Sequence, residues 1–566
     1  MKKNNVKVLT LLAFAGTMAT GCQLLKDVDY TVTPDPLEMH GDSVRVKVDV
    51  TFPEKALNKK AIVDITPTVG DAALKPVRVQ GEKATGNGNV IAFKAGGTVT
   101  YTDIVAYDPS MEASGLFVSG KIYKGEKEKD QLENTKIADA TIITPYLVNK
   151  DFKVIIAKDA FKRVTEESFG AQINFDKGRS VVKPGELKED DAKAYEAFLA
   201  AAQSNPKQAI KSINMTGFAS PEGEEDKNNS LSTDRATAGK EAGLKIAKIA
   251  ENQSAAGEVY NLSGSGEDYN GFKAMLSADT EMNEDDKNLV LRVLETISGS
   301  AEREQAMRDM GKTFSYLDKN IFPALRRVEM KIVYDQTGYS DEELKALTVS
   351  NSDTLKLEEL LFAATLYTDL NEQLRIYKIA EKNFPEDYRT SNNVGAVLYM
   401  QNKVSEAKVQ FEKANGIKDN AISKNNLGAV AGVSGDRKKS LELLNQANGA
   451  GSEVNYNKGI LNIQDGDYAD AISNLGSDAS FNKALAELLN GAPASVNGII
   501  EGSADKDSAQ GAYLKAVAAS RQDNLQSVVG NLTTAFSKDA SLKAKAAKDR
   551  EFVKYFENTS FTALVK

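Results

Sequence analysis

The chain has 566 residues, of which 41% are hydrophobic and 27% charged, and its net charge is −9. This balance is ordinary for a soluble globular protein, and the length allows about three or four domains. The acidic charge argues against a general nucleic-acid binder, which normally presents a basic field, and one Cys with one His excludes an internal disulfide and a histidine-rich metal site.

The N-terminus has the order of a secretory signal. Its first 22 residues, "MKKNNVKVLTLLAFAGTMATGC", place lysines before a short apolar run and then small residues. That run is shorter than the roughly 20 residues of a membrane-spanning helix. The only cysteine, Cys22, directly follows Ala19-Thr20-Gly21, which resembles a bacterial lipobox with Ala19 in the usual place of Leu. We expect residues 1–21 to be a lipoprotein signal peptide and Cys22 to be lipidated; the alternative is an ordinary signal peptide with a free cysteine.

Residues 22–150 are predicted to form an all-β sandwich. Short runs such as "DSVRVKVDVTF" and "AIVDITPTV" alternate or are β-branched, and Gly, Pro and Asn separate them. No long segment with helical periodicity intervenes, and short strands at this spacing are typical of a sandwich. The only histidine, His40, falls in this region, and we interpret it as a strand-edge residue, not a catalytic base.

Residues 151–338 alternate strands and helices, which predicts an α+β domain. A helical stretch at about 268–322 separates the last two strands. One helix is expected to end at Pro206, and the next to begin with Ser232 as its N-cap. The expected strands are 152–161, 209–219, 258–268 and 326–334, and the expected helices are 188–206 and 232–251.

Residues 339–566 are predicted to form an α-helical repeat array. Ala380 and Ala414 are 34 residues apart, and Pro385 falls between them where a repeat would end. The segments "NNVGAVLYMQNKVSEAKVQFEKAN" and "NNLGAVAGVSGDRKKSLELLNQAN" align, and the region resembles tetratricopeptide repeats over about 345–480, with further helices to 566. Small residues are expected because the two helices of a unit cross closely; generic helical hairpins are the alternative. The positions with small or aromatic residues include Gly395, Ala407, Phe411, Gly428 and Gly459.

The region 165–335 resembles the OmpA-like peptidoglycan-associating domain. Five segments carry the likeness in family order: "INFDKGRSVVKP" (Ile173–Pro184), the strand ending "MTGFAS" (Met215–Ser220), "NNSLSTDRA" (Asn228–Ala236), "LSGSGE" (Leu262–Glu267) and "RRVEMKI" (Arg326–Ile332). The helical insertion before the last motif is similar to that of extended OmpA-like domains in Bacteroidota envelope lipoproteins. The resemblance therefore implies a multi-domain α+β envelope protein with a central OmpA-like domain.

The resemblance also implies a peptidoglycan site that holds the carboxylate and amine of diaminopimelate. Arg235 matches the family's arginine, whose planar fork suits a carboxylate, and Asn228 begins the same motif. Ser220 stands in the place of the family's aspartate, and Glu222 follows two residues later. A serine supplies no charge, and losing a charge-assisted contact costs about 1.5–3 kcal/mol. Two hypotheses stay open: the domain binds cell-wall peptide through Arg235, or it is a structural module that does not bind cell-wall peptide.

The expected function is a non-enzymatic scaffold in the outer membrane. The lipid would anchor the chain, facing the periplasm, the central domain would lie on or near peptidoglycan, and the repeats would hold a protein partner. The alternative is an accessory subunit of an outer-membrane assembly, secretion or adhesin complex, without peptidoglycan binding. No catalytic residue, metal ligand, cofactor or nucleic-acid partner is predicted.

Overall fold

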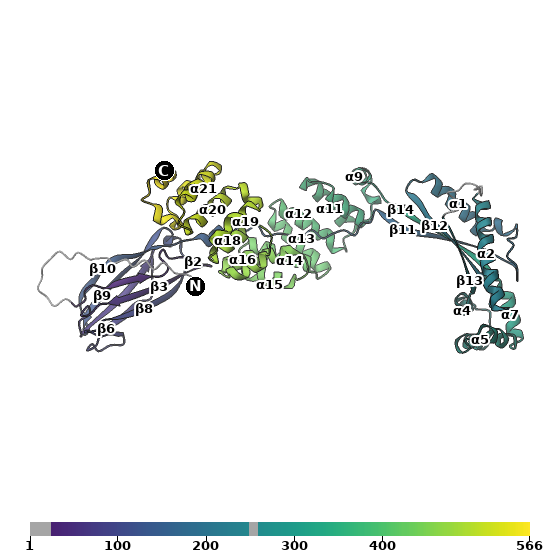
Figure 1. Ribbon diagram of the computed structural model, residues 1–566, viewed down its shortest axis with the longest axis horizontal. Helices are drawn as coiled ribbons and strands as arrows, with labels where there is room; N and C mark the ends of the chain where they lie inside the picture. The colour runs from purple at the N-terminus through teal and green to yellow at the C-terminus, as the bar shows by residue number, and fades with distance from the viewer. Residues whose placement is uncertain (1–23, 248–258) are drawn as a thin grey trace. The chain divides into compact units, whose positions relative to one another are not determined.

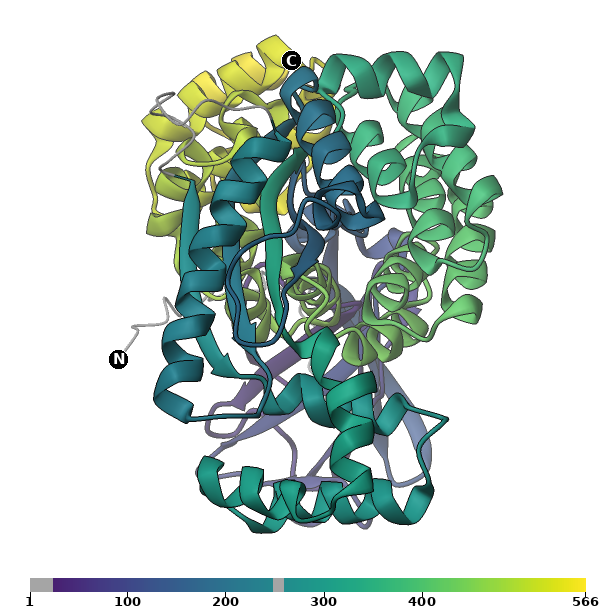
Figure 2. The same ribbon diagram turned by 90° about the vertical axis from the view of Figure 1, so that its right-hand side faces the viewer.

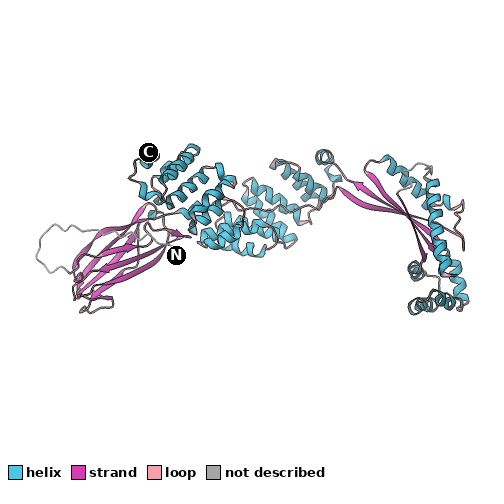
Figure 3. Ribbon diagram, viewed as in Figure 1, coloured by secondary structure: helices cyan, strands magenta, loops and turns pink. Residues whose placement is uncertain are grey.

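The computed structural model of the protein describes residues 24–247 and 259–566; the predicted signal segment and Cys22 lie outside the described residues. The chain forms two compact units (Figure 1). One unit joins the described residues up to Lys158 with Tyr367–Lys566, and the other is Asp159–Leu366. A β-rich N-terminal region and a C-terminal helical array are both present, as predicted (Figure 3). The domain limits 22–150, 151–338 and 339–566 stay predictions.

The N-terminal region is a sandwich of two sheets over one core. Along β3 (Ser43–Phe52) every second side chain is buried while Arg45 and Lys47 are exposed, because successive side chains of a strand point to opposite faces. The first sheet pairs β3 with β1 (Asp29–Val32), β2 (Met39–His40) and β8 (Gly97–Ala106). The second sheet, in the order β10-β9-β4-β6-β7 with β5 beside β4, contains β4 (Ala61–Val69), β5 (Ala72–Ala73), β6 (Val77–Gly81), β7 (Asn89–Ile91), β9 (Ser114–Lys124) and β10 (Lys127–Ala140).

The second unit contains a four-stranded sheet in the order β11-β14-β12-β13. Strand β14 (Arg327–Thr337) runs antiparallel to β11 (Val164–Asn174) and β12 (Gln208–Ala219), and β13 (Tyr260–Glu267) runs parallel to β12. Helices α1 (Asp190–Ser204) and α2 (Glu225–Ile246) pack on one face (Figure 2). Their apolar side chains share a core with those of the sheet, which confirms an α+β arrangement of this region.

The predicted helical insertion is present between β13 and β14 and has a hydrophobic core of its own. Buried Phe272, Leu317 and Phe322 are part of that core. Two further helices, α9 (Asp341–Ser350) and α10 (Leu357–Thr365), follow β14 in the same unit. The insertion comprises α4 (Tyr269–Ala278), α5 (Glu284–Thr296), α6 (Ser300–Arg308), α7 (Lys312–Asn320) and α8 (Phe322–Leu325).

The C-terminal part of the first unit is an array of paired helices. None of the helices within 24–247 and 259–566 has both the length and the apolar character needed to cross a membrane. The array contains α11 (Leu370–Asn383), α12 (Tyr388–Met400), α13 (Val404–Ile417), α14 (Ala421–Val433), α15 (Arg437–Gln446), α16 (Ser452–Asp465), α17 (Tyr468–Leu475), α18 (Phe481–Leu489), α19 (Val496–Glu501), α20 (Ala509–Arg521), α21 (Leu525–Lys538), α22 (Leu542–Ala546) and α23 (Thr559–Val565).

Helix pairs of the array touch at glycines, as the repeat pattern predicts. A methyl group on any of these glycines would meet a side chain of the following helix. The distance from that added carbon would be 2.8 Å to Phe411 for Gly395, 3.0 Å to Leu444 for Gly428 and 2.6 Å to Leu475 for Gly459. The close crossing is therefore the physical reason for small residues at these positions.

Gly459 and Gly530 are expected to respond to alanine with opposite signs. Gly459→Ala overlaps Leu475 and should lower the free energy of unfolding by about 1–3 kcal/mol, as overpacking does. Gly530 lies within α21 with open space around it, so Gly530→Ala should raise that free energy by about 0.5–1 kcal/mol through helix propensity. Hydrogen exchange of α16 and α21 would measure both changes; equal effects would contradict this packing.

Two local predictions are wrong. Residues 152–161, predicted as a strand, are extended but belong to no sheet of the described chain; their backbone is hydrogen-bonded by asparagine side chains instead, as described below. Ser232 is not an N-cap, because α2 begins at Glu225, directly after the turn at Gly223. Ser232 lies within α2, where its Oγ donates to Asn229 O and accepts from Gly266 N.

Candidate functional site

Three of the four residues predicted to bind peptidoglycan meet in the loop between β12 and α2. The Ser220 hydroxyl donates to Glu222 Oε1 at 2.9 Å. Asn228 Nδ2, on the first turns of α2, donates to the Ser220 and Glu222 carbonyls and to Glu267 Oε1. All three side chains are buried. The loop is therefore held closed by its own polar groups.

The Glu222 carboxylate is neutralised from two sides. Arg326, directly before β14, donates to Glu222 Oε1 through Nε at 3.0 Å and Nη2 at 2.5 Å. Lys177 Nζ lies 2.8 Å from Glu222 Oε2. Glu222 is 7% exposed, and a buried charge is tolerated where it is paired in this way. Glu222 thus already has two cationic partners within the domain.

Arg235 lies apart from these three residues and is only 1% exposed. Its guanidinium donates to three backbone carbonyls: to Arg179 from Nε, to Phe218 from Nη1 and to Asp176 from Nη2, at 2.7–3.2 Å. Burial, with a smaller contribution from the Arg326 charge, lowers the pKa of Arg235 to about 10. The side chain therefore joins the loop after β11 to the end of β12 and does not face solvent.

The helical insertion covers this loop. Glu304 of α6 accepts a hydrogen bond from the Gly223 backbone N–H. Asp318 of α7 lies 2.9 Å from Arg326 Nη2 and 3.0 Å from Lys177 Nζ. Ser300, at the start of α6, donates to Glu267 at 2.5 Å. The insertion thus supplies anionic and hydroxyl partners to the groups that surround the predicted cleft.

The contacts of Asp318 are expected to weaken in acid. Burial tends to raise the pKa of this carboxyl, but the Lys177 hydrogen bond and the Arg326 charge outweigh it, so the pKa is lowered. Its stabilising effect is therefore complete above the ordinary value near 3.9 and is lost as pH falls through the lower, folded-state pKa. The protection of α7 amides, measured relative to the intrinsic exchange rate at each pH, should fall below about pH 4. In Asp318→Asn this protection should be lower at neutral pH and change little on acidification; identical pH profiles would refute this.

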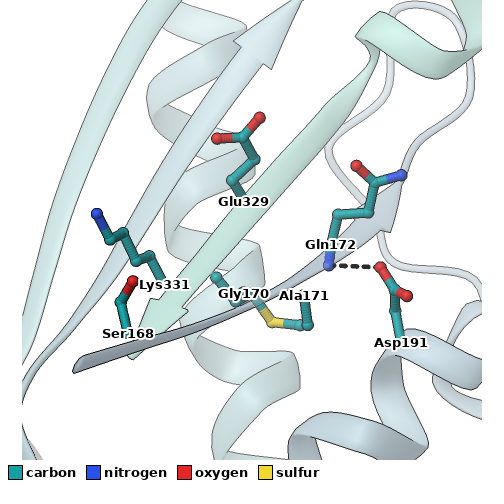
Figure 4. Close-up of a pocket in the computed structure, with 8 residues that line it drawn as sticks. Ser168, Gly170, Ala171, Gln172, Asp191, Glu329 and Lys331 are labelled. Carbon is teal, nitrogen blue, oxygen red and sulfur yellow. Dashed lines mark hydrogen bonds between the residues drawn. The ribbon is translucent and has the colours of Figure 1, made fainter. Parts of the chain in front are cut away.

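The described residues include two further polar features, a histidine and a depression on the central sheet. His40 packs against Tyr468, with ring centroids 5.1 Å apart, and burial lowers its pKa. A depression of about 340 Å³ on the sheet between β11 and β14 is open above Gly170, and Asp191 on its rim accepts from Gln172 N (Figure 4). Among residues 24–247 and 259–566, no group of His, Cys, Asp and Glu side chains is placed to hold a metal ion.

The second candidate site is a row of asparagines in the helical array, here named the asparagine ladder: Asn393, Asn426, Asn457 and Asn482. They lie on α12, α14, α16 and α18, and all four are fully buried. The ladder holds an extended stretch of the same chain, residues 149–157, here named the resident segment. The segment immediately precedes the boundary between the two compact units.

Each ladder asparagine binds both backbone groups of one residue of the resident segment. Its Oδ1 accepts from the N–H at 2.7–2.8 Å, and its Nδ2 donates to the C=O of the same residue at 2.8–2.9 Å. An amide side chain thus acts as a neighbouring strand would. The pairs are Asn482 with Asn149, Asn457 with Lys153, Asn426 with Ile155, and Asn393 with Ala157.

The spacing of the pairs follows strand geometry. The first helices of three successive helix pairs, α16, α14 and α12, bind Lys153, Ile155 and Ala157, which are every second residue. In an extended chain such residues point to the same side. The chain direction of the segment is opposite to the order of the repeats. Successive repeats therefore bind every second residue of the segment, which is the spacing of residues on one side of a β-strand.

A second set of asparagines links neighbouring ladder positions. Asn392 donates to the Ile155 carbonyl at 3.0 Å and accepts from Asn426. Asn425 donates to the Lys153 carbonyl and accepts from Asn457 in the same way. A buried polar group without a hydrogen-bond partner costs free energy. In this network the asparagines are partners both of the segment's backbone and of one another. The resident segment and the repeats therefore form one hydrogen-bonded unit.

Side chains of the resident segment add a smaller set of contacts. Phe152 is 2% exposed and packs on Gly432, where an added methyl would lie 2.5 Å from its ring. The Asp151 carboxylate accepts from the Tyr456 hydroxyl at 2.9 Å, and Lys153 Nζ lies 3.8 Å from the centre of the same ring. Val154 and Ile155 pack against the core of the array.

The ladder was missed in the sequence, although a signal for it is present. Each of Asn393, Asn426 and Asn457 stands two residues before a glycine that marks its repeat. A polar residue that recurs at a fixed offset from a buried packing position is itself buried, and buried amides require partners. The partner could not be read from the repeats, because it lies more than 200 residues earlier in the chain.

No family model and no curated protein matches the sequence. Among solved structures the chain is similar to YrrB, described as a TPR protein with an unusual peptide-binding site (19% identity, 36% of this chain and 99% of that chain, TM-score 0.22). It is also similar to a tetratricopeptide repeat protein from Parabacteroides merdae (13%, 44% and 98%, TM-score 0.28) and to the APC/C hetero-tetramer Cut9-Hcn1 (10%, 67% and 81%, TM-score 0.31).

The C-terminal array is tetratricopeptide-like, in agreement with the repeats found in the sequence. Paired helices that cross at Gly395, Gly428 and Gly459 define the repeat within this chain. The similarity to these structures, at TM-scores of 0.22–0.31, does not extend to what the array binds.

Proposed function

We propose that the protein is a non-enzymatic scaffold that is lipid-anchored at the outer membrane and binds protein partners through its helical repeats. Stacked helix pairs form extended surfaces that suit protein ligands. The asparagine ladder supports this function most directly, because it is built to hold an extended polypeptide backbone. The anchor would be the lipid on Cys22, which follows the lipobox-like Ala19-Thr20-Gly21.

We further propose that the central domain is an OmpA-like module that serves as an interface in an outer-membrane assembly. Its motifs carry the resemblance, but the burial of Glu222 and Arg235 and their internal partners leave neither charge exposed. This observation favours the accessory-subunit function over the peptidoglycan tether. The tether is the second candidate, supported by Arg235 at the matching position.

Affinity purification of tagged full-length protein from detergent-extracted envelopes tests the scaffold. Outer-membrane proteins in stoichiometric amounts are expected; their absence would overturn the proposal. The tether is tested by sedimenting the purified protein with sacculi, with and without free diaminopimelate-containing peptide. Retention that the peptide abolishes would establish the tether instead of the accessory subunit.

Lipidation is tested separately at Cys22. Cys22→Ser should abolish incorporation of a labelled fatty acid and shift the protein from the membrane fraction to the soluble fraction. Unchanged labelling would contradict the anchor, whereas loss of the anchor alone would leave the repeats able to bind partners.

A further inference from the structure

The resident segment occupies the ladder almost entirely through its backbone. Four ladder residues contact N–H and C=O groups that every non-proline residue carries. Nothing in these contacts depends on which amino acids the segment contains, except that proline lacks the N–H. The ladder therefore recognises an extended conformation rather than a sequence.

Selectivity comes from three side-chain positions. The first takes Asp151, whose carboxylate accepts from Tyr456 and, at 3.3 Å, from Asn482. The second is the recess at Gly432, which encloses the Phe152 ring. The third receives Ile155, whose Cδ1 lies 3.4 Å from where a methyl on Gly451 would stand. Together they accept an acid, an aromatic and, three residues after the aromatic, an aliphatic residue. The two positions between hold Lys153, over the Tyr456 ring, and Val154, against the core of the array.

We propose that the resident segment is an intramolecular competitor, and that the ladder binds a partner's extended segment of the form acid–aromatic–x–x–aliphatic when the resident segment leaves. This inference rests on the proposed function that the repeats bind protein partners, and it names the partner class and the regulation of that site. The partner needs N–H groups at the ladder positions, so it carries no proline there.

The resident segment has the properties of a releasable competitor. It forms no sheet with the rest of the described chain; Lys150, near its start, and Lys158, directly after its end, are exposed. A tethered ligand competes at an effective concentration of about millimolar. A partner's apparent affinity is reduced by the fraction of molecules in which the groove is open, so the intact protein should bind such a segment weakly.

The test uses full-length protein and a fluorescent peptide of residues 149–159, measured by anisotropy. Phe152→Ala removes the largest buried side chain of the resident segment, and its peptide affinity should be at least about tenfold tighter than that of the wild type. Lys150→Ala, at an exposed position of the same segment, should behave as the wild type. A peptide with alanine in place of the aromatic should bind more weakly to every variant.

Hydrogen exchange shows whether the segment has left the ladder. Exposed amides at 149–157 in Phe152→Ala with no gain in peptide binding would overturn the proposal, as would wild-type affinity equal to that of the variant. Adding Asn426→Ala to Phe152→Ala should abolish the gain. If Phe152→Ala does not fold, Asp151→Ala tests the same competition at the Tyr456 contact. Partners that co-purify with the wild type would keep the scaffold function intact even if this competition fails.

Discussion

Asn426→Ala is expected to lower the local free energy of unfolding around the ladder by about 2–4 kcal/mol. Asn426 accepts from the Ile155 N–H, donates to the Ile155 carbonyl and donates to Asn392. Its loss leaves a buried backbone donor unpaired, and each buried polar group without a partner costs about 1–3 kcal/mol. The effect should reach the resident segment and α14 together, because both lie in one network.

Hydrogen exchange is the appropriate measurement, because it resolves opening free energies segment by segment in a chain of several parts. The matched control is Asn497→Ala in α19, where the side chain is exposed and the change should stay within about 0.5 kcal/mol. If the amides of residues 153–157 exchanged equally slowly in both variants, the ladder would not be what holds the segment.

Arg235→Met is expected to destabilise the second unit by about 3–5 kcal/mol, the scale for removing a buried group that others depend on. Methionine fills much of the volume but leaves the carbonyls of Asp176, Phe218 and Arg179 without their donor. Thermal unfolding of the full chain, with hydrogen exchange of β12 and α2, would measure the loss.

This substitution also separates a structural role from a ligand role. Asp234→Ala alters the exposed neighbour on the same helix and should leave the stability unchanged within about 0.5 kcal/mol. Were Arg235→Met as stable as Asp234→Ala, the guanidinium would be free for a ligand, and the peptidoglycan tether would regain its main support.

The predicted peptidoglycan site shows which features of a site a sequence motif can predict and which it cannot. The motif "NNSLSTDRA" led to a helix that carries Arg235, but the predicted start at Ser232 left Asn228 outside the helix, whereas α2 contains both residues and Asn228 contacts the loop of Ser220. It could not show that Arg326 and Lys177 already neutralise Glu222, because those partners come from other segments. Burial of a charge is a property of everything packed around it, and the insertion that completes that packing has its own sequence.

For residues 152–161 too, the sequence predicts the backbone conformation but not the hydrogen-bond partners. Its β-branched residues correctly predict an extended chain, since that preference is local. Whether the chain pairs with a strand or with side chains depends on what lies opposite, and Asn426 is 271 residues away from Ile155. The N-cap predicted at Ser232 failed for a related reason, because packing against β12 and β13 extended α2 toward the loop.

Short-range periodicity in the sequence was enough to predict the alternating valines of β3, the glycines at which repeat helices cross, and the helical insertion between the last two strands of the central sheet, but not strand β11 of that sheet. Long-range packing sets that the ladder is filled by the chain's own segment and that Arg235 and Glu222 face inward. Both outcomes are set by contacts between distant parts of the chain. The recurring asparagines mark one side of the ladder in the sequence, but nothing in the repeats identifies the segment that fills it.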